Sequence, residues 1–476
     1  MNMHLRGPIW ILVLAFLSIT VSAQDVKPGE IHASVTVQQD PAYSYALYLP
    51  SNYTPQKRWP ILLAFDPFGR GVSPVKLFQE GAEKYGFIVV GSNNSRNFSD
   101  PSKAIRLTWD DVIHKFSIDP RGFYTTGLSG GARVASSIAI ACKSCVAGVI
   151  ACAAGLPQNT KTLPETTEWF LATGTVDFNY PEMLQLHENL DKHHLANRLD
   201  VFDGPHGWMP AAMAEEALAW MRLRAMIKGT VPVDQTFVEA EFKKRTDSAQ
   251  ASLEKGDILS AWRADQDIVN DFSKLRDVSA TEKALQQLNS SKELQRARKN
   301  EKAAIDLQKL VEEKLNAALR DSSAGTDDKD LSTRTGDHDA LGQLQSAVNE
   351  EQRALRKEKD PSSRDGVTRG LWSAFVSSME SGQQALLAKD YSTAKRMFQA
   401  ATIIMPEVAW PHSALASAYA VTGDKKQALS ELRKAVDNGF SNPEAFSDKD
   451  FDRLRDDPAF KELVARVNEK AQSKRN

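Results

Sequence analysis

Between about residues 29 and 228 the sequence alternates short apolar runs with segments of helical length. Several of these runs are apolar without interruption, as expected for strands that are covered on both faces. Strands that alternate with helices predict a mostly parallel, doubly wound sheet with right-handed crossovers. The expected strands are Ala33–Val37, Tyr45–Leu49, Ile61–Phe65, Phe87–Gly91, Phe123–Thr126, Val146–Ala151, Trp169–Thr173 and Leu199–Phe202. The expected helices are Pro74–Tyr85, Lys103–Phe116, Gly131–Ala141, Glu182–His194 and Met209–Ile227. This part of the chain, residues 29–228, is therefore predicted to be an α/β domain.

The chain changes character after this domain. Residues 236–320 are rich in Ala, Glu, Lys, Gln and Leu and have almost no glycine, which predicts helices. They could form either a solvated spacer or a packed helical hairpin, and the sequence leaves both open. Residues 321–340 are polar and loop-like, so we expect a flexible linker there. An all-α region thus follows the α/β domain.

Residues 368–470 contain an internal repeat with a period of 34 residues. The repeated positions are Ala394, Phe398 and Ala401, which recur as Ala428, Leu432 and Ala435, and Asp390, which recurs as Asp424. Small residues at this period, where paired helices meet, are typical of tetratricopeptide repeats, and the segment resembles them. A further apolar stripe is expected to form one capping helix; it consists of Phe451, Leu454, Phe460 and Leu463. The resemblance implies binding of a protein partner; alternatively, these helices only stabilise or dimerise the chain.

Residues 1–23 have the pattern of a secretory signal peptide. Ile9–Val21 is almost wholly apolar, and Val21-Ser22-Ala23 has the small-x-small pattern that signal peptidase recognises. Thirteen apolar residues are fewer than the ~20 that span a bilayer, which favours a cleaved signal over an uncleaved anchor. The net charge of −2 excludes a bulk electrostatic attraction to nucleic acid. The mature protein is predicted to be periplasmic or secreted, with no stable membrane span.

The chain has three cysteines, too few for a scaffold built on disulfides. Cys142 and Cys145 lie at the end of a predicted helix, and in an exported protein they predict a small structural disulfide. No second cysteine pair exists to complete a zinc site with them. Cys152 lies in an apolar strand and is expected in the core. No metal or organic cofactor is implied.

The predicted chemistry centres on Ser129, which stands in a G-x-S-x-G motif, Gly127–Gly131. The motif follows a predicted strand and opens a predicted helix, and this context makes it more specific than the five residues alone. A sharp strand-to-helix turn needs glycine because the neighbouring backbone crowds a strained serine. Such a turn lifts the Ser129 hydroxyl above the sheet and directs the amide of Gly130 toward a developing oxyanion.

A serine nucleophile needs a histidine base that an acid holds in place. His206 follows the predicted strand Leu199–Phe202 in a turn, where open α/β sheets gather functional groups. The three other histidines after Ser129 in this domain share one helical segment and are expected on its solvated face; they are His187, His193 and His194.

Three acids compete for the role of partner to His206. Asp177 is favoured because it is the first acid after the strand Trp169–Thr173. Glu182, which opens a helix, and Asp203, which is close to His206 in sequence, remain alternatives.

Three segments carry a resemblance to a known family: Tyr45–Pro50, Ile118–Gly131 and Asp203–His206. Together they resemble α/β-hydrolase fold esterases over about residues 30–227, and in particular polyhydroxybutyrate depolymerases, feruloyl esterases and dienelactone hydrolases. The resemblance implies a serine hydrolase that cleaves small or polymeric carboxylic esters through a covalent acyl-enzyme. It implies Ser129 as nucleophile, His206 as general acid and base, and Asp177 as its partner.

The sequence departs from this family after the third strand, where relatives often have a His-Gly pair. This chain has Asp66-Pro67-Phe68-Gly69 instead, and Pro67 has no N–H to donate. The second oxyanion donor is therefore assigned to the amide of Phe68. The departure leaves open an interaction protein with a vestigial hydrolase domain, and the triad serves a serine peptidase equally well. Because every candidate catalytic residue precedes Ile227, residues 24–232 are expected to fold and hydrolyse a small activated ester alone.

Overall fold

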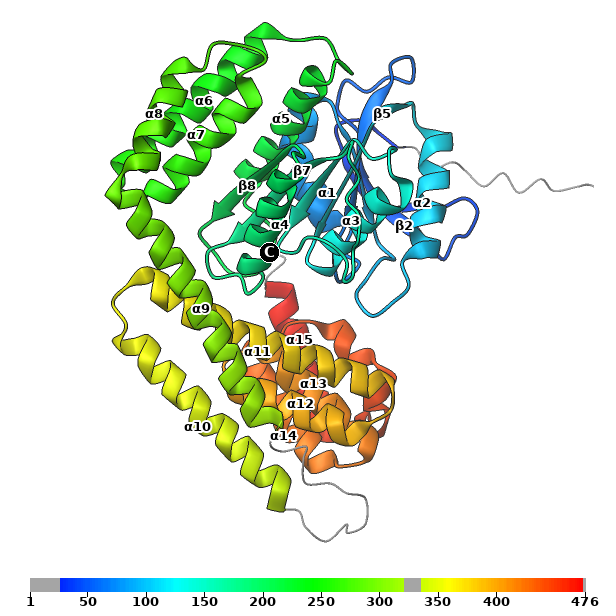
Figure 1. Cartoon of the computed structure of the whole chain (residues 1–476). Coiled ribbons are helices and arrows are strands. Elements are labelled where there is room, and N and C mark those ends of the chain that lie inside the picture. Colours follow the sequence, from blue (N-terminus) through cyan, green and yellow to red (C-terminus); the bar gives the residue numbers. More distant parts are fainter. Residues whose placement is uncertain (1–25, 321–334, 474–476) are drawn as a thin grey trace, which may run out of the picture.

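The computed structural model describes residues 26–320 and 335–473, in an α/β domain followed by a helical region (Figure 1). The predicted signal, residues 1–23, lies outside the described residues, as do residues 321–334 of the predicted linker. No helix in the described ranges is long and apolar enough to cross a bilayer.

The α/β domain is built on one eight-stranded sheet with the order β1-β2-β4-β3-β5-β6-β7-β8. β2 pairs antiparallel with β1 and β4, and all other neighbouring strands are parallel. The strands are β1 (Ile31–Thr36), β2 (Ser44–Tyr48), β3 (Trp59–Phe65), β4 (Ile88–Ser92), β5 (Ile118–Leu128), β6 (Gly148–Cys152), β7 (Glu168–Gly174) and β8 (Asn197–Phe202). The predicted fold class is confirmed.

Five helices cover the two faces of this sheet. They are α1 (Val72–Tyr85), α2 (Ser102–Lys115), α3 (Gly130–Cys142), α4 (Tyr180–Lys192) and α5 (Ala211–Ile227). Apolar residues of α2, α3 and α4 share one buried cluster with the sheet, whereas those of α1 and α5 share the other. Because both faces are covered, the central strands carry apolar side chains on each side, which explains their continuous apolar sequences.

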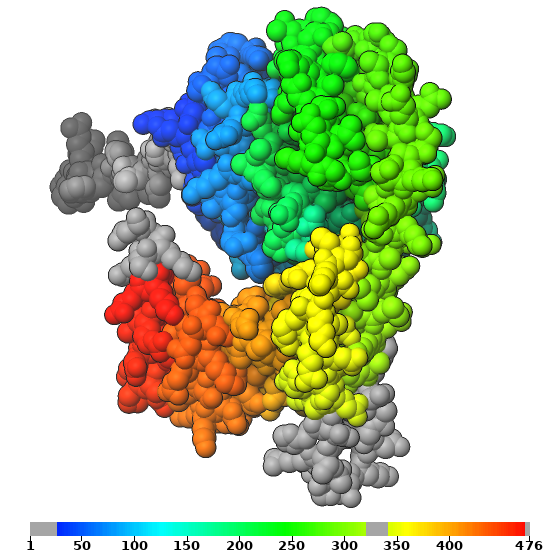
Figure 2. Space-filling view, turned by 90° about the vertical axis from the view of Figure 1, so that its left-hand side faces the viewer, coloured from blue at the N-terminus to red at the C-terminus, as the bar shows by residue number. Residues whose placement is uncertain are grey.

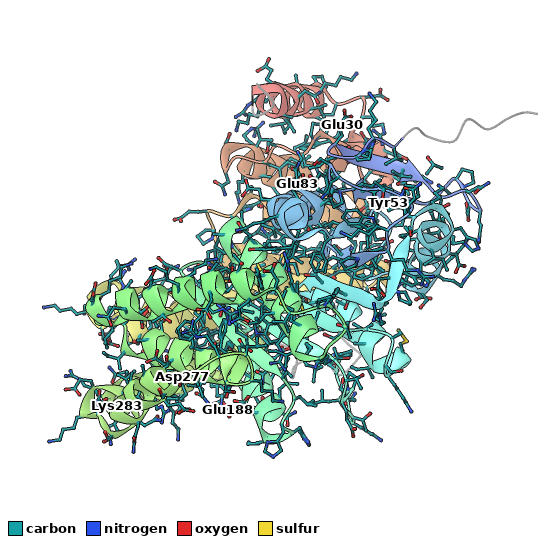
Figure 3. The ribbon with its side chains drawn as sticks, turned by 90° about the horizontal axis from the view of Figure 1, so that it is seen from above. Glu30, Tyr53, Glu83, Glu188, Asp277 and Lys283 are labelled. Carbon is teal, nitrogen blue, oxygen red and sulfur yellow. A yellow bond between two sulfur atoms is a disulfide. The ribbon has the colours of Figure 1, made fainter. Side chains whose placement is uncertain are left out.

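Residues 235–290 form three helices: α6 (Gln235–Glu254) and α7 (Ile258–Phe272), which pack on the α/β domain, and α8 (Ser279–Ser290), which packs on α7. Leu223 and Met226 of α5 share a core with Ile268 and Phe272 of α7. The indole of Trp220 on α5 also donates to Asp271 Oδ2 on α7 at 2.8 Å. These helices are thus a packed hairpin with an added helix, not a solvated spacer. Seen from above, Asp277 and Lys283 of this unit lie on one side of the molecule and Tyr53 on the other (Figure 3).

The remaining helices form a second unit beside the α/β domain, and α9 runs from one unit to the other (Figure 1). They are α9 (Lys292–Arg320), α10 (Thr335–Lys357), α11 (Pro361–Leu387), α12 (Tyr391–Ile404), α13 (Ala409–Thr422), α14 (Lys425–Asp437) and α15 (Pro458–Ser473). Helix α10 begins at Thr335, so the last six residues of the predicted linker, 335–340, belong to this helix. In a space-filling view a hollow separates the blue N-terminal part from the orange helices (Figure 2).

The 34-residue period appears in the structure as two helix pairs. Asp390 caps α12 by accepting a hydrogen bond from the amide of Thr393, and Asp424 caps α14 in the same way with Gln427, both at 3.1 Å. Their assignment to the tetratricopeptide class stays a prediction. The prediction of a single capping helix is wrong. Its apolar stripe shares one core but is divided between a 3-10 helix, Lys449–Leu454, and α15.

Candidate active site

The predicted turn around Ser129 forms between β5 and α3. Ser129 has φ 54° and ψ −121°, a strained conformation that an L-residue rarely adopts. Side chains would not fit beside it: a Cβ added to Gly127 would lie 2.1 Å from the Gly131 carbonyl oxygen, and one added to Gly131 would lie 2.1 Å from that of Phe65. The amide of Ser129 donates to the Cys152 carbonyl at 2.9 Å. The glycines are therefore required by backbone crowding, as the motif predicts.

His206 and Asp177 meet at the carboxyl ends of two neighbouring strands, β8 and β7. The distance from His206 Nδ1 to Asp177 Oδ1 is 2.9 Å, and the Asp177 side chain is fully buried. The amide of Asn179 donates to the same Oδ1 at 2.8 Å, and the ring of Phe178 stacks on His206 with centroids 4.3 Å apart. With the Nδ1 proton directed at the carboxylate, Nε2 is the ring nitrogen that can accept a proton.

The two alternative acids have other partners. Glu182 forms an ion pair with Arg133 at 2.7 Å and accepts a hydrogen bond from the Gly155 amide at 3.0 Å. Asp203 accepts a hydrogen bond from the Thr175 hydroxyl at 3.3 Å. The structure thus brings Asp177, and neither alternative, to His206.

The three histidines of α4 and its C-terminal end do not share one environment. His193 and His194 are exposed, as expected. His187 is partly buried and hydrogen-bonded to Asn197, so its expected place on a solvated face is wrong.

Cys152 connects the serine turn with the histidine loop. It is a free, fully buried thiol at the end of β6, which confirms its expected place in the core. The Cys152 carbonyl accepts a hydrogen bond from the Ser129 amide. The Cys152 thiol donates a hydrogen bond to the Gly207 carbonyl, with 3.3 Å between Sγ and the oxygen. Burial raises the pKa of the Cys152 thiol, so it stays protonated. The other two cysteines, Cys142 and Cys145, form the predicted disulfide.

The loop after β3 does not offer the Phe68 amide as the sequence suggested. This N–H donates to Asp66 Oδ1 at 2.9 Å, so it is already occupied by a buried carboxylate. Asn97, which no sequence motif indicates, lies beside the serine turn: a Cβ added to Gly130 would lie 2.0 Å from its Oδ1 and 3.1 Å from its Nδ2. Among the described residues, its carboxamide has no hydrogen-bond partner, and its backbone amide is held by the Pro67 carbonyl at 2.8 Å. An isolated Asn in a loop carries no sequence signal for this placement.

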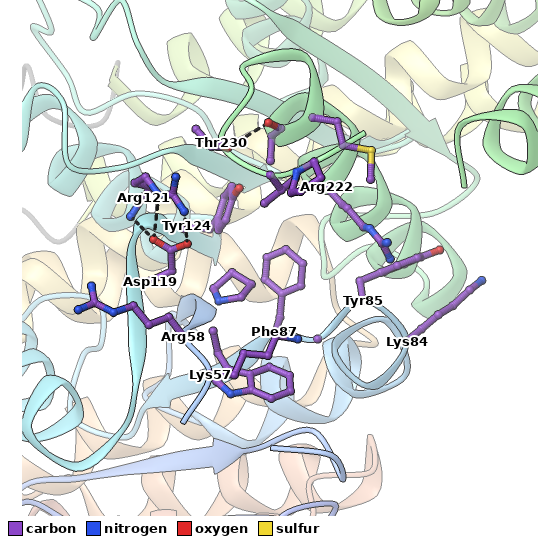
Figure 4. Close-up of a pocket in the computed structure, with 18 of the residues that line it drawn as sticks. Lys57, Arg58, Lys84, Tyr85, Phe87, Asp119, Arg121, Tyr124, Arg222 and Thr230 are labelled. Atoms are coloured by element: carbon purple, nitrogen blue, oxygen red, sulfur yellow. Dashed lines mark hydrogen bonds and ion pairs between the residues drawn. The ribbon is translucent and has the colours of Figure 1, made fainter. Parts of the chain in front are cut away.

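A cavity of about 390 Å³ lies at the other end of the sheet, where β3 and β5 begin (Figure 4). Its rim is basic, but three of its cations already have carboxylate partners. These pairs are Lys84 with Glu215, Arg121 with Asp119, and Arg222 with Asp234. Within the described residues no cluster of His, Cys, Asp and Glu is arranged to hold a metal ion.

Comparison with known proteins gives matches among solved structures only, because no family model and no curated protein matches the chain. The chain is similar to the S-formylglutathione hydrolase of Staphylococcus aureus, with 14% identity and a TM-score of 0.33 over 41% of this chain and 99% of that one. A ferulic acid esterase matches with 15% identity and a TM-score of 0.34 over 41% and 98%. An esterase of Mycobacterium marinum matches with 16% identity and a TM-score of 0.33 over 40% and 82%. By its own sheet order and serine turn, the N-terminal part of this chain has an α/β-hydrolase type of fold, followed by an all-helical region.

Proposed function

We propose that the chain is a serine hydrolase that cleaves carboxylic esters with Ser129, His206 and Asp177. The observation that carries the proposal is the 2.9 Å hydrogen bond between His206 Nδ1 and the buried Asp177 carboxylate. It lies at the same sheet edge as the strained Ser129. Strain of this kind is expected at functional positions, because the surrounding fold has to enforce it.

In the proposed reaction the Ser129 oxygen attacks the ester carbonyl carbon while His206 Nε2 accepts the serine proton. The tetrahedral intermediate collapses, and the alcohol leaves with the proton that His206 returns. Water then attacks the acyl-enzyme with His206 again as base, and the carboxylic acid departs. Asp177 holds the imidazole in the required tautomer and stabilises the imidazolium.

We assign the oxyanion donors to the amide of Gly130 and the carboxamide of Asn97. Gly130 is the first residue of α3, whose amide has no partner within the helix. Asn97 lies against it with a carboxamide that is not otherwise engaged among the described residues. This assignment replaces Phe68, whose amide would first have to leave Asp66.

We also propose that the protein is exported and that its helical repeats bind a protein partner. The signal-like residues 1–23 and the Cys142–Cys145 disulfide support export, since disulfides persist in oxidising compartments. The paired helices with equivalent Asp390 and Asp424 caps support a repeat surface.

The proposal is tested with a fluorophosphonate probe and p-nitrophenyl acetate on the full chain. We expect covalent labelling and ester turnover in the wild type, and loss of both in Ser129→Ala. Ser137→Ala is the matched control, because Ser137 is exposed on the same helix and its hydroxyl donates to the Arg133 carbonyl within that helix. Absence of labelling in the folded wild type would contradict the proposal and favour the vestigial hydrolase.

The acid assignment is tested in the same assay. Asp177→Asn should lower kcat by roughly 10⁴-fold, the loss typical of a missing tautomer-setting acid. Glu182→Gln should retain most activity. The opposite pattern would overturn the assignment, and turnover of peptides in preference to esters would overturn the substrate class.

A further inference from the structure

The segment that carries Asp177 is held from two sides. Within the α/β domain, the amide of Thr175 donates to the Phe202 carbonyl at 2.9 Å and the amide of Val176 to the Gly204 carbonyl at 3.1 Å. The carbonyls of Thr175 and Phe178 instead accept hydrogen bonds from the helical region. Carbonyls that are largely shielded from water need partners, so this partly buried segment depends on helices far away in sequence.

Arg369 of α11 supplies the first of these bonds. Its Nη1 donates to the Thr175 carbonyl at 2.7 Å and its Nε to Gln308 Oε1 on α9 at 2.8 Å. The side chain is only 3% exposed, and its guanidinium lies over the ring of Tyr180, 4.7 Å from the centroid. Among the described residues, Arg369 forms no ion pair with a carboxylate, and the nearby Glu301 is paired with Arg263 at 2.7 Å instead. A buried cation without such a partner is costly, which points to a role beyond packing.

The charged groups around Arg369 include the proposed catalytic acid. Burial lowers the pKa of Arg369, and the nearby groups that oppose this shift are Tyr180, Asp365, Glu301 and Asp177. Glu380, three turns further along α11, faces His206 and Arg133 closely enough that both oppose the rise that burial causes in its pKa. Together with the bond from Arg369 to the Thr175 carbonyl, this places α11 beside the segment that carries Asp177.

Gln308 of α9 supplies the second bond. Its Nε2 donates to the Phe178 carbonyl at 2.8 Å, and the side chain is 3% exposed. Phe178 is the residue whose ring stacks on His206. The two helical side chains thus hold the carbonyl two residues before Asp177 and the carbonyl one residue after it.

The close approach of α9 and α11 requires two glycines. A Cβ added to Gly366 would lie 2.4 Å from the Ala304 carbonyl oxygen, and one added to Gly370 would lie 2.6 Å from Val311 Cβ. Both glycines flank Arg369 on α11 and bring its guanidinium to Gln308. The contact between the helices is therefore built in a way that places both polar side chains against the segment of Asp177.

We propose that Arg369 and Gln308 are positioning residues for the reaction, and that the helical region sets the geometry of Asp177 and of the ring that stacks on His206. The inference rests on the proposed serine hydrolase. It names no new catalytic residue, because neither side chain touches the reacting groups.

The test is a double-mutant cycle in the full chain, with p-nitrophenyl acetate as substrate and circular dichroism and thermal melting as folding controls. Arg369→Met should lower kcat by about tenfold or more with KM within about twofold, since an effect on orientation acts on the chemical step. In an Asp177→Asn background the same substitution should change kcat by less than about twofold, because the group that it positions is already disabled. A merely structural role would lower kcat equally in both backgrounds and would overturn the proposal.

Two further variants keep the test decisive if Arg369→Met does not fold. Gln308→Met removes the hydrogen bonds to the Phe178 carbonyl and to Arg369, together with one to Glu312 on its own helix, and should also lower kcat. Arg369→Lys should recover only part of the activity, because one ammonium lacks the fork that reaches both oxygens. Arg364→Met is the matched control, since Arg364 is exposed on the same helix. Wild-type activity in Gln308→Met would overturn the inference. The proposed function would still stand in that case if the probe labels Ser129 in the wild type.

Discussion

The indole of Trp208 donates a hydrogen bond to Asp66 Oδ2 at 3.1 Å and thereby ties the histidine loop after β8 to the loop after β3. Asp66 is 1% exposed and also accepts from the Phe68 amide and from Arg70. The acid that interrupts the family pattern after the third strand therefore joins two loops of the proposed active site.

This connection predicts the effect of Trp208→Phe, which keeps an aromatic ring beside Phe78 but removes the indole N–H. We expect the free-energy barrier to rise by roughly 1–1.5 kcal/mol, and hence kcat to fall about tenfold, because Asp66 Oδ2 loses the indole donor that ties the two loops together and keeps the Arg70 Nη2 donor at 3.3 Å. Trp262→Phe is the control, since it removes an indole hydrogen bond to Asn289 on the exposed side of α7. Equal kcat values for both variants would show that the connection does not serve catalysis.

Asn97→Ala tests the second oxyanion donor. Removing one such donor lowers kcat by about 10²- to 10³-fold in the best-studied case, and we expect a fall of that order with little change in KM. The control is Asn349→Ala on α10, whose carboxamide oxygen accepts a hydrogen bond from Gln345 at the surface. If Asn97→Ala keeps its kcat, the Phe68 amide returns as the candidate donor, and the bond to Asp66 must then open in the reaction.

Asp265 of α7 predicts a pH dependence of stability. Burial raises the pKa of Asp265 to about 6, above the 3.8 of a free Asp. A carboxyl with a raised folded-state pKa destabilises the fold when ionised, and this penalty fades as the pH falls through about 6 toward 4. Asp265→Asn should therefore raise the melting temperature at pH 8 and have a smaller effect at pH 5. Asp306→Asn, at an exposed position of α9, should show no such difference, and equal shifts at both pH values for Asp265→Asn would contradict the prediction.

The isolated fragment 24–232 is now expected to be inactive, contrary to the expectation from sequence. Without the helical region, Leu223 and Met226 of α5 lose their apolar partners. Each side chain that becomes fully exposed lowers the free energy of unfolding by roughly 1.5–3 kcal/mol. The Thr175 and Phe178 carbonyls also lose their donors. The measurement is kcat/KM on p-nitrophenyl acetate for the fragment and the full chain, with circular dichroism on both. If the fragment is folded and its kcat/KM is within about tenfold of that of the full chain, a difference of ~1.4 kcal/mol in the barrier, the α/β domain is active on its own, as the sequence predicted.

Local sequence patterns predicted most of the fold. All eight strands and five covering helices of the α/β domain were expected, because apolar runs and helical periodicity reflect burial directly. The largest error is at β5, which begins at Ile118 and not at Phe123, because its first residues are polar or exposed. The sequence did not decide between a solvated spacer and a packed hairpin for α6 and α7. Their apolar positions indicate that one face is covered, but they do not indicate which element covers it. The linker end at residue 340 was wrong because a polar composition does not exclude a helix such as α10.

Local patterns were enough to predict the α/β sheet, the strained Ser129 turn and the order of the serine, acid and histidine, because apolar runs, helical periodicity and the glycine-rich motif are visible in consecutive residues. The sequence favoured Asp177 but left Glu182 and Asp203 as alternatives. The tertiary structure resolves this choice, since it depends on which loop ends lie side by side at β7 and β8. It alone also placed Asn97 beside Gly130 and Arg369 against the Thr175 carbonyl, which is 194 residues away in sequence. Contacts of this kind leave no periodic pattern in the chain, because packing between distant elements brings the residues together.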